Sequence, residues 1–460
     1  MTPPLVTVIT PVRDTRDYLA AWFASLRAQT LAPGELEVLA VDDASTDGSD
    51  AELRRLAASW PEVLRVQYLT EPGGPARARN AALREARGRY VFFLDSDDRL
   101  GDDALRRLTS AADRLGSDVV VGRVVGVNGR WVCPELFRET LEEVRFPGGA
   151  LAWSLSPAKL FRRELLTRHG LRFPEDLPVY SDTPFVLEAF FRARRISVLA
   201  DYDYYYLLAR DDRSNITTTA RLADRLRGTT AGIAVVLRFT SPGPVRDEVN
   251  DRYIRSDLVN LFGPEFLRLD HDGRAELVAA AGALARPHLT DAIRARCNES
   301  QRLRLHCLQH GLTEELTDLV RHESEHGGLP EPVTATASWS PDGLRVQTSR
   351  ALPGLVSEPV TWLSDTVGRV ASGDETIIPL RDLLPRQRST VRLEANWAGR
   401  SVAARIAGEL PPRRVWHAGR VYRLTPKPGA NGELEVWAAR IRLHRVVRLR
   451  VQRLREVALR

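Results

Sequence analysis

The sequence predicts an open α/β domain with a mostly parallel sheet, then a helical region, then a small β-rich domain. Three observations support this order. Apolar strands alternate with amphipathic helices over the first hundred residues, as in parallel sheets that helices cover on both faces. A helical period continues from about residue 220 to 326 with few strand signals, and a period of two begins near residue 333. The expected domains are 1–220, 221–328 and 329–460.

The strands and helices of the first domain alternate regularly. Strands are expected at Leu5–Thr10, Leu36–Val41, Val63–Leu69 and Tyr90–Leu94, and helices around Tyr18–Leu26, at Asp50–Trp60 and at Ala76–Arg87. In such sheets, ligands bind outside the carboxyl ends of the strands. Asp42 and Asp43 follow the second strand, and Asp95, Asp97 and Asp98 follow the fourth. Acidic residues therefore gather where a ligand is expected.

The rest of the chain contains shorter elements. Asn128 and Gly129 indicate a hairpin turn, and Gly170 is expected to end a helix. Glycines and prolines within 327–332 mark a domain boundary. The expected elements are short strands within Val119–Phe146, helices at Leu160–His169 and Thr183–Arg194, a tyrosine-rich strand at Ile196–Tyr206, and, after the boundary, strands at Val333–Trp339, Leu344–Thr348, Val391–Ala395 and Ser401–Ile406 that suggest a small β-sandwich.

Composition excludes several classes of protein. Apolar residues make up 43% and charged residues 27% of the 460 residues, which argues against a disordered or collagen-like chain. No apolar run approaches the roughly 18 residues of a membrane-spanning helix, and the amino terminus lacks the pattern of a signal peptide. Three scattered cysteines without a CxxC pair indicate neither disulfides nor zinc. We expect a cytoplasmic protein, with the inner face of the cell membrane as an open alternative.

Positive charge concentrates at the carboxyl end. The formal net charge is +6. Pro411–Arg460 carries 13 Arg and Lys against three Glu, a net of +10, which leaves −4 for residues 1–410. Within this segment, Ile441–Leu459 alternates apolar residues with arginine. Such a segment is compatible with contact to anionic lipid or an anionic polymer, and equally with a solvated basic surface.

Three loops at the expected ligand edge have the chemistry of a nucleotide site. Carboxylates such as Asp95 and Asp97 are oxygen ligands that Mg²⁺ or Mn²⁺ prefers. The alternative is that Asp97 or Asp98 caps a helix that begins near Asp102. Asp43 lies in a second acidic turn. The third loop, Gly73–Asn80, places arginines at the start of a helix, and guanidinium groups match phosphate oxygens.

These segments resemble the family 2 nucleotide-sugar glycosyltransferases, which have the GT-A fold with a Rossmann-like open sheet. The matching text is VTVITPVRDTRDYLAAWFASLRAQT, EVLAVDDASTDGS, GGPARARNAALREARGRYVFFLDSDD, AKLFRRELL and GLRFPEDLPVYSDTPFVLEAFFRARR, in the family's order over about residues 4–220. The resemblance extends to enzymes that glycosylate teichoic-acid or capsule polymers. It implies that Pro11 and Asp43 border the nucleoside, Arg79 lies near the donor phosphates, and Asp95 and Asp97 form the DxD element, with Asp97 on the metal.

The resemblance also implies an acceptor base. The base is usually the second acid of a Glu-Asp pair, and here that place is Ser181-Asp182, so Asp182 is the expected base. Asp176 is the rival. Arg210 and Ser214 follow a tyrosine-rich segment that the family uses as a loop near the donor, and they are expected to contact the diphosphate. The alternating tyrosines equally predict a half-buried strand.

The activity that follows is metal-dependent, inverting transfer of a sugar, with UDP as the nucleotide and Mn²⁺ or Mg²⁺ as the cofactor. The acceptor is expected to be a hydroxyl of a bacterial cell-surface polymer or glycan, either anionic or neutral. A base accepts the proton of the attacking hydroxyl, a contribution of roughly 10² to 10⁴ in rate. The metal offsets charge on the departing diphosphate. A base opposite the leaving group predicts inversion at the anomeric carbon.

Other functions stay open from the sequence. His322, Glu323 and His326 satisfy the HExxH pattern of zinc hydrolases, although Gly327 should fray that helix. The chain could also be a non-catalytic protein whose β-rich domain binds a glycan or polyanion. For residues 329–460 we predict a role in homo-oligomer assembly or in holding the acceptor. Peripheral membrane contact stays open, and no nucleic-acid partner is expected.

Overall fold

The structure is a computed structural model that describes residues 3–148, 150–210, 220–352, 354–363, 368–384, 388–398, 400–407, 410–429 and 433–441. The chain divides into two compact units. Unit 1 is Met1–Glu265 with Ala279–Cys297, and unit 2 is Phe266–Val278 with Asn298–Arg460. Among the described residues, no helix has both the length and the apolar character needed to cross a bilayer.

Unit 1 contains a mixed sheet in the order β3-β2-β1-β4-β9-β6-β10-β8. The pairs among the first four strands are parallel, whereas β9 runs antiparallel to both of its neighbours. The strands are β1 (Val6–Val12), β2 (Leu36–Asp42), β3 (Leu64–Tyr68), β4 (Tyr90–Phe93), β6 (Val119–Gly122), β8 (Leu141–Val144), β9 (Leu160–Arg162) and β10 (Ile196–Leu199).

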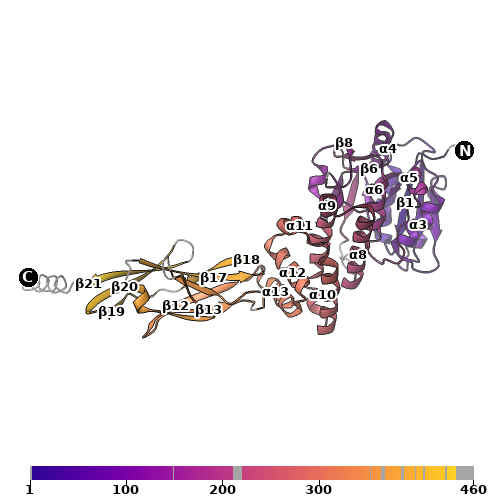
Figure 1. Ribbon diagram of the computed structural model, residues 1–460. Helices are drawn as coiled ribbons and strands as arrows, with labels where there is room; N and C mark the ends of the chain where they lie inside the picture. Colours follow the sequence, from indigo (N-terminus) through magenta and orange to yellow (C-terminus); the bar gives the residue numbers. More distant parts are fainter. Residues whose placement is uncertain are drawn as a thin grey trace, which may run out of the picture. The chain divides into compact units, whose positions relative to one another are not determined.

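The core of this sheet follows from its sequence. Every residue of β2 and β4 is buried, as expected for strands that helices cover on both faces. The helices of this part are α1 (Arg16–Arg27), α2 (Ser49–Ser59), α3 (Gly74–Glu85), α4 (Ala104–Leu115), α5 (Arg163–Arg168) and α6 (Asp182–Arg192), drawn from indigo to magenta in Figure 1. The predicted α/β fold is confirmed.

A second, small sheet of unit 1 has the order β5-β11-β7. It joins β5 (Arg99–Leu100), β7 (Val124–Val127) and β11 (Tyr205–Leu208). Because β5 follows the acidic turn at Asp95–Asp98, this sheet brings the tyrosine-rich segment to that turn. Tyr204 and Tyr205 are 1% and 2% exposed. The strand interpretation of the tyrosines is therefore confirmed for residues 205–208.

Three local predictions differ from the structure. Leu160–His169 is not one helix, because its first three residues form β9 in the middle of the sheet before α5 begins. Ile196–Tyr206 is not one strand, because the chain turns after β10 and enters the second sheet as β11. Asn128 and Gly129 do form a turn with positive φ, but β7 before it pairs in parallel with β11 rather than with a hairpin partner.

Helices follow the sheets, as predicted. Unit 1 contains α8 (Leu222–Phe239), α9 (Pro244–Arg252), the π-helical turn η3 (Tyr253–Leu258) and α11 (Asp291–Arg296), and α8 packs against α6. The further helices are α10 (His271–Ala285), α12 (Glu299–His310) and α13 (Thr313–His326). Asn298 caps α12 through a capping box with Gln301, which explains the sharp start of that helix.

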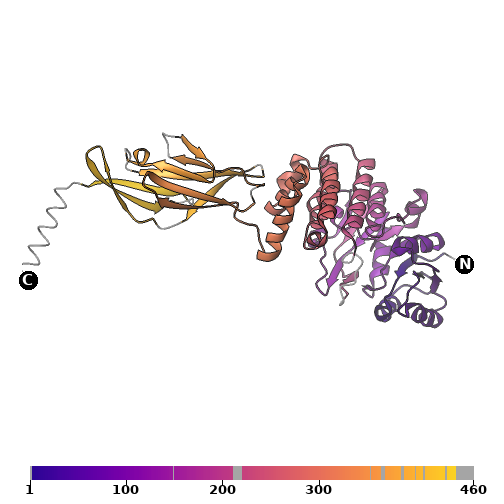
Figure 2. The ribbon, with the colours of Figure 1, turned by 90° about the horizontal axis from the view of Figure 1, so that it is seen from below.

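The β-rich region of unit 2 confirms the predicted strands (Figure 2, orange to yellow). Its order is β16-β13-β12-β18-β17-β21-β20-β19, and β14 pairs with β15 and β17. The bounds are β12 (Val333–Trp339), β13 (Gly343–Arg350), β14 (Val360–Leu363), β15 (Gly368–Ser372), β16 (Glu375–Pro379), α14 (Leu380–Leu383), β17 (Arg388–Trp397), β18 (Arg400–Ala407), β19 (Arg413–His417), β20 (Arg420–Pro428) and β21 (Leu434–Ile441).

Candidate active site

The acidic turn after β4 is tied to two other segments by its side chains. Asp95 Oδ1 accepts a hydrogen bond from Arg79 Nη2 at 2.6 Å. Asp97 Oδ2 accepts one from Arg210 Nε at 2.7 Å. Asp98 accepts from the Tyr205 hydroxyl at 2.6 Å and from the Leu208 backbone N–H at 2.7 Å. The turn is therefore held between α3 and the segment that continues from β11.

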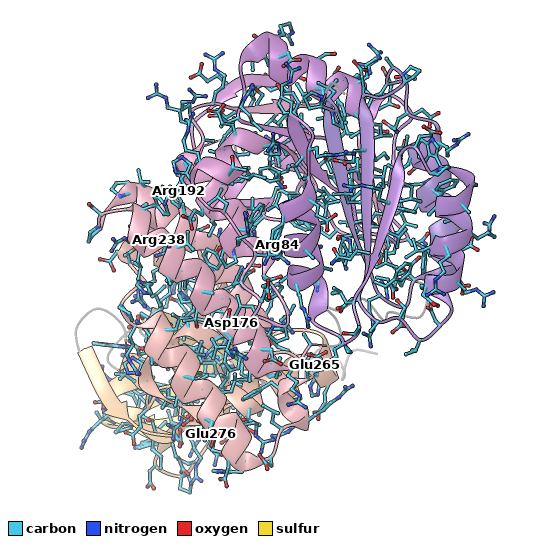
Figure 3. All side chains as sticks on the ribbon, turned by 90° about the vertical axis from the view of Figure 1, so that its right-hand side faces the viewer. Arg84, Asp176, Arg192, Arg238, Glu265 and Glu276 are labelled. Carbon is cyan, nitrogen blue, oxygen red and sulfur yellow. The ribbon has the colours of Figure 1, made fainter. Side chains whose placement is uncertain are left out.

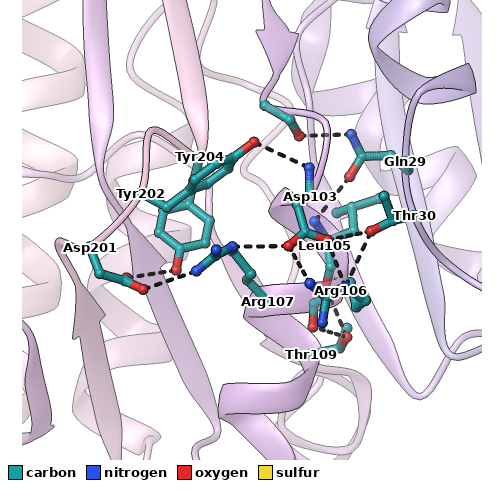
Figure 4. Close-up of polar contacts among 11 residues, drawn as sticks. Gln29, Thr30, Asp103, Leu105, Arg106, Arg107, Thr109, Asp201, Tyr202 and Tyr204 are labelled. Carbon is teal, nitrogen blue, oxygen red and sulfur yellow. Dashed lines mark hydrogen bonds and ion pairs between the residues drawn. The ribbon is translucent and has the colours of Figure 1, made fainter.

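The alternative that Asp97 or Asp98 caps the next helix is wrong. Helix α4 begins at Ala104, and Asp103 occupies the cap position. The first turn of α4 is instead anchored around Asp103, whose carboxylate contacts Thr30, Arg106 and Arg107 (Figure 4). Gln29 joins the same network by donating to the carbonyl of Gly101 at 2.9 Å. The carboxylates of Asp97 and Asp98 are thus not used to start the helix.

Burial and crowding raise the pKa of two carboxylates of the turn. Burial and the charge of Asp95 raise the pKa of Asp97, while Arg210 opposes the shift. Burial and the neighbouring Asp97 and Asp95 raise the pKa of Asp98 well above its ordinary value. Crowded carboxylates are stabilised by a divalent cation, and their oxygens are the hard ligands that Mg²⁺ and Mn²⁺ prefer.

The described residues fit such a cation only in part. No group of three or more His, Cys, Asp and Glu able to hold a metal occurs in the described part of the chain. Asp97 is the carboxylate of the turn that points to Arg210, with 13% of its side chain exposed. A metal held by Asp97 would therefore need donor oxygens and water to complete its coordination.

The predicted nucleoside residues lie together at the ends of β1 and β2. Pro11 is paired with Val41 in the parallel register, and the Asp43 backbone N–H donates to the Val12 carbonyl at 2.8 Å. The Asp43 carboxylate accepts backbone hydrogen bonds from Gly73 at 2.7 Å and Gly74 at 2.8 Å. Asp43 thus fixes the loop that enters α3, a structural role that the sequence analysis did not predict.

Arg79 is the cation that links the donor edge to the expected base. It is 6% exposed, and its guanidinium carbon lies 5.3 Å from the centre of the Phe173 ring. Its Nη2 bonds Asp95, while its Nε has no acceptor among the described residues. Against the effect of burial, the negative charges of Asp95 and Asp182 raise the pKa of this guanidinium. Arg79 therefore contacts Asp95 and is within electrostatic influence of Asp182, while its contact with the donor phosphates stays a prediction.

Asp182 begins α6 and is half-buried. Burial raises its pKa, Asp95 adds to the shift, and Arg79 and Arg252 oppose it. Tyr180, two residues before Asp182, has a φ of +61°, a left-handed conformation that is strained for a residue other than glycine. The helix α8 fits closely against this residue, because a Cβ on Gly228 would lie 2.7 Å from the Tyr180 Cβ.

Asp176, the rival base, has a different environment. Its side chain is exposed, and its carbonyl accepts a hydrogen bond from Arg227 Nη2 at 2.8 Å. Figure 3 labels it on a loop beside the helices of unit 1. A general base benefits from a pKa raised toward neutrality, and burial provides this for Asp182. The surroundings of the two residues therefore favour Asp182.

Two basic residues near Asp182 were missed by the sequence analysis. Lys159 is 1% exposed, and its Nζ donates to the Ser156 carbonyl at 2.6 Å and to the Ser154 hydroxyl at 3.2 Å. Burial lowers the pKa of Lys159 to about 7, and the charge of Asp182 opposes this shift. The sequence did contain a sign that Lys159 is unusual, because it is one of only two lysines in an arginine-rich chain.

Arg252 is the second missed residue. It ends α9, its Nη1 donates to the Ala152 carbonyl at 3.0 Å, and its Nε lies 3.6 Å from Asp257 Oδ2. Its charge lowers the pKa of Asp182. Nothing in the sequence distinguished this arginine from the many others of the helical region, so the contribution of α9 to the site could not be predicted.

Two further expectations concern other parts of the chain. Ser214 lies outside the described residues. In the HExxH motif, Glu323 is paired with Arg304 and accepts a hydrogen bond from the Ser300 hydroxyl at 2.8 Å. The rings of His322 and His326 stack with centroids 4.3 Å apart. The glutamate is therefore engaged in packing α13 against α12 rather than presented as a base.

A hollow of about 460 Å³ lies beside α4 and is distinct from the predicted donor residues. Its arginines are already paired: Arg106 and Arg107 with Asp103, and Arg114 with Glu142. The hollow therefore offers no excess of positive charge for an anionic ligand.

Comparison with known proteins identifies the first half of the chain. Residues 7–167 match the family described as Glycosyl transferase family 2, and residues 227–320 match the Glycosyl transferase TarS linker domain. Residues 7–167 form a family 2 glycosyl transferase domain. The predicted GT-A fold and helical linker are thereby confirmed, and Gly228 and Arg252 lie within the linker match.

Curated relatives of this glycosyl transferase domain are named as glycosyltransferases of poly(ribitol-phosphate). The poly(ribitol-phosphate) beta-glucosyltransferase of Bacillus spizizenii is 35% identical over 206 residues, 45% of this chain and 32% of the relative. The poly(ribitol-phosphate) beta-N-acetylglucosaminyltransferase TarS of Staphylococcus aureus is 36% identical over 208 residues, 45% of this chain and 36% of the relative. The chain thus matches about a third of the length of these relatives.

Solved structures extend the likeness beyond the glycosyl transferase domain. A crystal structure of a Staphylococcus aureus TarS fragment in complex with UDP matches with a TM-score of 0.59 and 26% identity, over 76% of this chain and 98% of the fragment. The same fragment with UDP-GlcNAc matches equally well. A longer TarS structure matches 95% of this chain at 22% identity with a TM-score of 0.57, which shows a shared fold.

Proposed function

We propose that this protein transfers a sugar from a UDP-sugar to a hydroxyl of a poly(polyol phosphate) of the bacterial cell surface, with inversion at the anomeric carbon. The observation that carries the proposal is the arrangement of Asp95, Arg79 and Asp182 within a family 2 domain. It joins a donor-side carboxylate, a buried cation and a half-buried candidate base. The relatives that resemble this domain are named for transfer to poly(ribitol phosphate).

The residues of the site have separate roles in this proposal. Pro11 and Asp43 border the nucleoside, with the Gly73–Gly74 loop held by the Asp43 carboxylate. Arg79 and Arg210 are the cations beside the carboxylates of the donor turn. Guanidinium groups in these positions would bind the diphosphate, because their forked donors match phosphate oxygens. Ser214 remains a predicted diphosphate contact.

Asp182 is the proposed base. It accepts the proton of the attacking hydroxyl as the bond to the anomeric carbon forms, which is needed because a neutral hydroxyl is a weak nucleophile. Its environment suits this role, since burial raises its pKa while Arg79 and Arg252 keep the carboxylate form accessible. A base on the acceptor side and a diphosphate leaving from the other side give in-line displacement.

Asp97 is the proposed metal ligand, for Mn²⁺ or Mg²⁺. When bound there, the ion would offset the negative charge that develops on the departing diphosphate. Asp97 is paired with Arg210, and this guanidinium would bind the donor phosphates beside the ion.

A donor-binding assay tests the proposal directly. UDP-sugars and GDP-sugars are titrated against the full chain with Mn²⁺, with Mg²⁺ and with a chelator, and thermal unfolding is followed. A UDP-sugar at 100 times its dissociation constant should add about 2.7 kcal/mol to the free energy of unfolding. Transfer of the sugar to poly(ribitol phosphate) should accompany binding. Absence of a UDP-sugar effect under every metal condition would refute the proposed function.

A further inference from the structure

One face of the β-rich sheet in unit 2 carries large exposed aromatic side chains. Trp416 in β19 is 70% exposed, Trp437 in β21 is 40% exposed, and Trp362 in β14 is 37% exposed. Tryptophan is strongly buried on average in folded proteins. Several exposed tryptophans on one surface therefore indicate a binding surface rather than a core.

The strand register places these tryptophans on the same face. Trp362 is directly opposite Arg392 of β17, and Trp437 is directly opposite Arg388 of the same strand. Residues opposite one another in an antiparallel pair point to the same side, as do residues two apart along a strand. Arg388 and Arg392 are four apart in a strand that alternates between buried and exposed residues. Trp362 and Trp437 therefore share a face.

The same argument adds Trp416. Trp437 is opposite Thr425 of β20, and Val421 of β20 is opposite Trp416. Thr425 and Val421 are four apart, so all three tryptophans lie on one side. The opposite side holds the core, with Val391, Val436 and Leu424 at 0% exposure. We call the solvent side of β14, β17, β21, β20 and β19 the tryptophan face.

Positive charges are interleaved with the aromatic rings of the tryptophan face. Arg388 and Lys427 lie over the Trp437 ring at 5.6 Å and 5.4 Å from its centre. Arg388 also pairs with Glu435, and Arg392 pairs with Glu433 at 3.2 Å. Arg414 and Arg423 lie on this face, two residues along the register from the pair of Trp416 and Val421 and on the same side of the sheet.

Arg414 and Arg423 are the decisive pair. They stand directly opposite one another on β19 and β20, and Arg414 lies two residues from Trp416. Both are exposed, and neither forms an ion pair with another described residue. Like charges directly opposite each other destabilise a sheet. A bound anion would remove this repulsion, so the pair indicates an anionic ligand.

We propose that the tryptophan face binds an anionic polyol-phosphate or sugar-phosphate polymer, which under the proposed function is the acceptor. The indole rings offer flat surfaces for the C–H faces of sugars and polyols, and the guanidinium groups match phosphodiester oxygens. An uncharged glycan would not use Arg414 and Arg423, and a purely inorganic polyanion would not use the tryptophans. Tryptophans and arginines that alternate on one face fit a polymer in which sugar or polyol units alternate with phosphodiesters.

The test uses two double variants of the full chain with equal charge change. Arg414→Glu with Arg423→Glu alters the tryptophan face. Arg420→Glu with Arg440→Glu alters β20 and β21 on the other face, because Arg420 is opposite His417 and Arg440 is opposite Tyr422. Binding of poly(ribitol phosphate) is measured by calorimetry at low and high salt, with dextran and polyphosphate as comparison polymers.

We expect the first pair of substitutions to weaken poly(ribitol phosphate) binding by about tenfold or more, and the second pair by less than about threefold. Trp416→Ala should weaken it as well, and binding should weaken as salt rises. UDP-sugar binding should stay unchanged in every variant, so its loss would count against the proposed function instead. Equal effects of both pairs would overturn the inference. A change of oligomeric state in light scattering without a change in polymer binding would show that a second copy occupies the face.

Discussion

The two units use their charged residues in opposite ways. In the glycosyl transferase domain, Arg79 and Asp98 are nearly inaccessible and engage specific partners. On the tryptophan face, Arg414 and Arg423 are exposed and oppose one another. Burial changes proton affinity and fixes geometry, which chemistry requires, whereas exposed charge attracts a polymer of variable position. The comparison separates a domain whose buried charges suit catalysis from a surface whose exposed charges suit binding of the acceptor polymer.

The largest effect is expected for the proposed base. Asp182→Asn removes the proton acceptor but keeps the shape of the side chain, so turnover should fall by roughly 10² to 10⁴. Donor affinity should change little, because the base acts on the acceptor hydroxyl. Steady-state transfer and UDP-sugar titration measure the two quantities. If Asp176→Asn loses turnover and Asp182→Asn does not, the assignment of the base is wrong.

The next effect concerns the proposed metal ligand. Asp97→Asn should remove most of the Mn²⁺-dependent part of UDP-sugar affinity, because the amide lacks the charge that holds a divalent ion. The fold should persist, because the substitution weakens the hydrogen bond from Arg210 Nε but keeps the size of the side chain. Titration with and without chelator measures the effect. Donor affinity that responds to Mn²⁺ as in the unaltered protein would remove Asp97 from the metal site.

A smaller effect is expected where the linker helix meets the base. Gly228→Ala places a methyl group 2.7 Å from the Tyr180 Cβ, so the loop before Asp182 must shift. A displacement of about 1 Å near a reacting group costs up to about 10² in turnover. Gly263→Ala is the control, because its Cβ would have no neighbour within 4 Å. Equal turnover in both variants would show that α8 does not position the base.

The smallest effect is a dependence of stability on pH. Burial lowers the pKa of Lys159 to about 7, whereas an unfolded lysine titrates near about 10.4. Between these values the unfolded chain binds more protons than the folded one, so the free energy of unfolding should rise as pH increases from about 7 to 10. Lys159→Met should flatten this rise, and the exposed Lys427→Met should not. Denaturant unfolding across this pH range measures the free energy of unfolding of the three proteins. An equal dependence on pH in all three would contradict the lowered pKa of Lys159.

The sequence predicted those parts of the fold whose signal is local. The strands β1, β2 and β4 are rich in apolar and β-branched residues, and the acidic turn that follows β4 is visible without any tertiary information. The three residues of β9 were assigned to a helix, because so short a strand has no period of its own and is specified by its neighbours β4 and β6.

The parts that could not be predicted depend on contacts between distant segments. Arg252 reaches the carbonyl of Ala152, a hundred residues earlier in the chain. The tryptophan face joins residues from Trp362 to Trp437 through the register of four strand pairs. A period of two indicates that a strand has two faces, but it does not indicate which strands are adjacent.

The most direct test of the central claim measures transfer by two variants on two acceptors. Asp182→Asn and the pair Arg414→Glu with Arg423→Glu are assayed with UDP-sugar, on a single ribitol-phosphate unit and on long poly(ribitol phosphate). Asp182→Asn should lose turnover on both acceptors. The arginine pair should keep turnover on the short acceptor and raise only the KM for the polymer, by about tenfold or more. Two results would contradict the account that Asp182 acts in catalysis and the tryptophan face binds the polymer. They are loss of turnover on the short acceptor by the arginine pair, and full activity of Asp182→Asn.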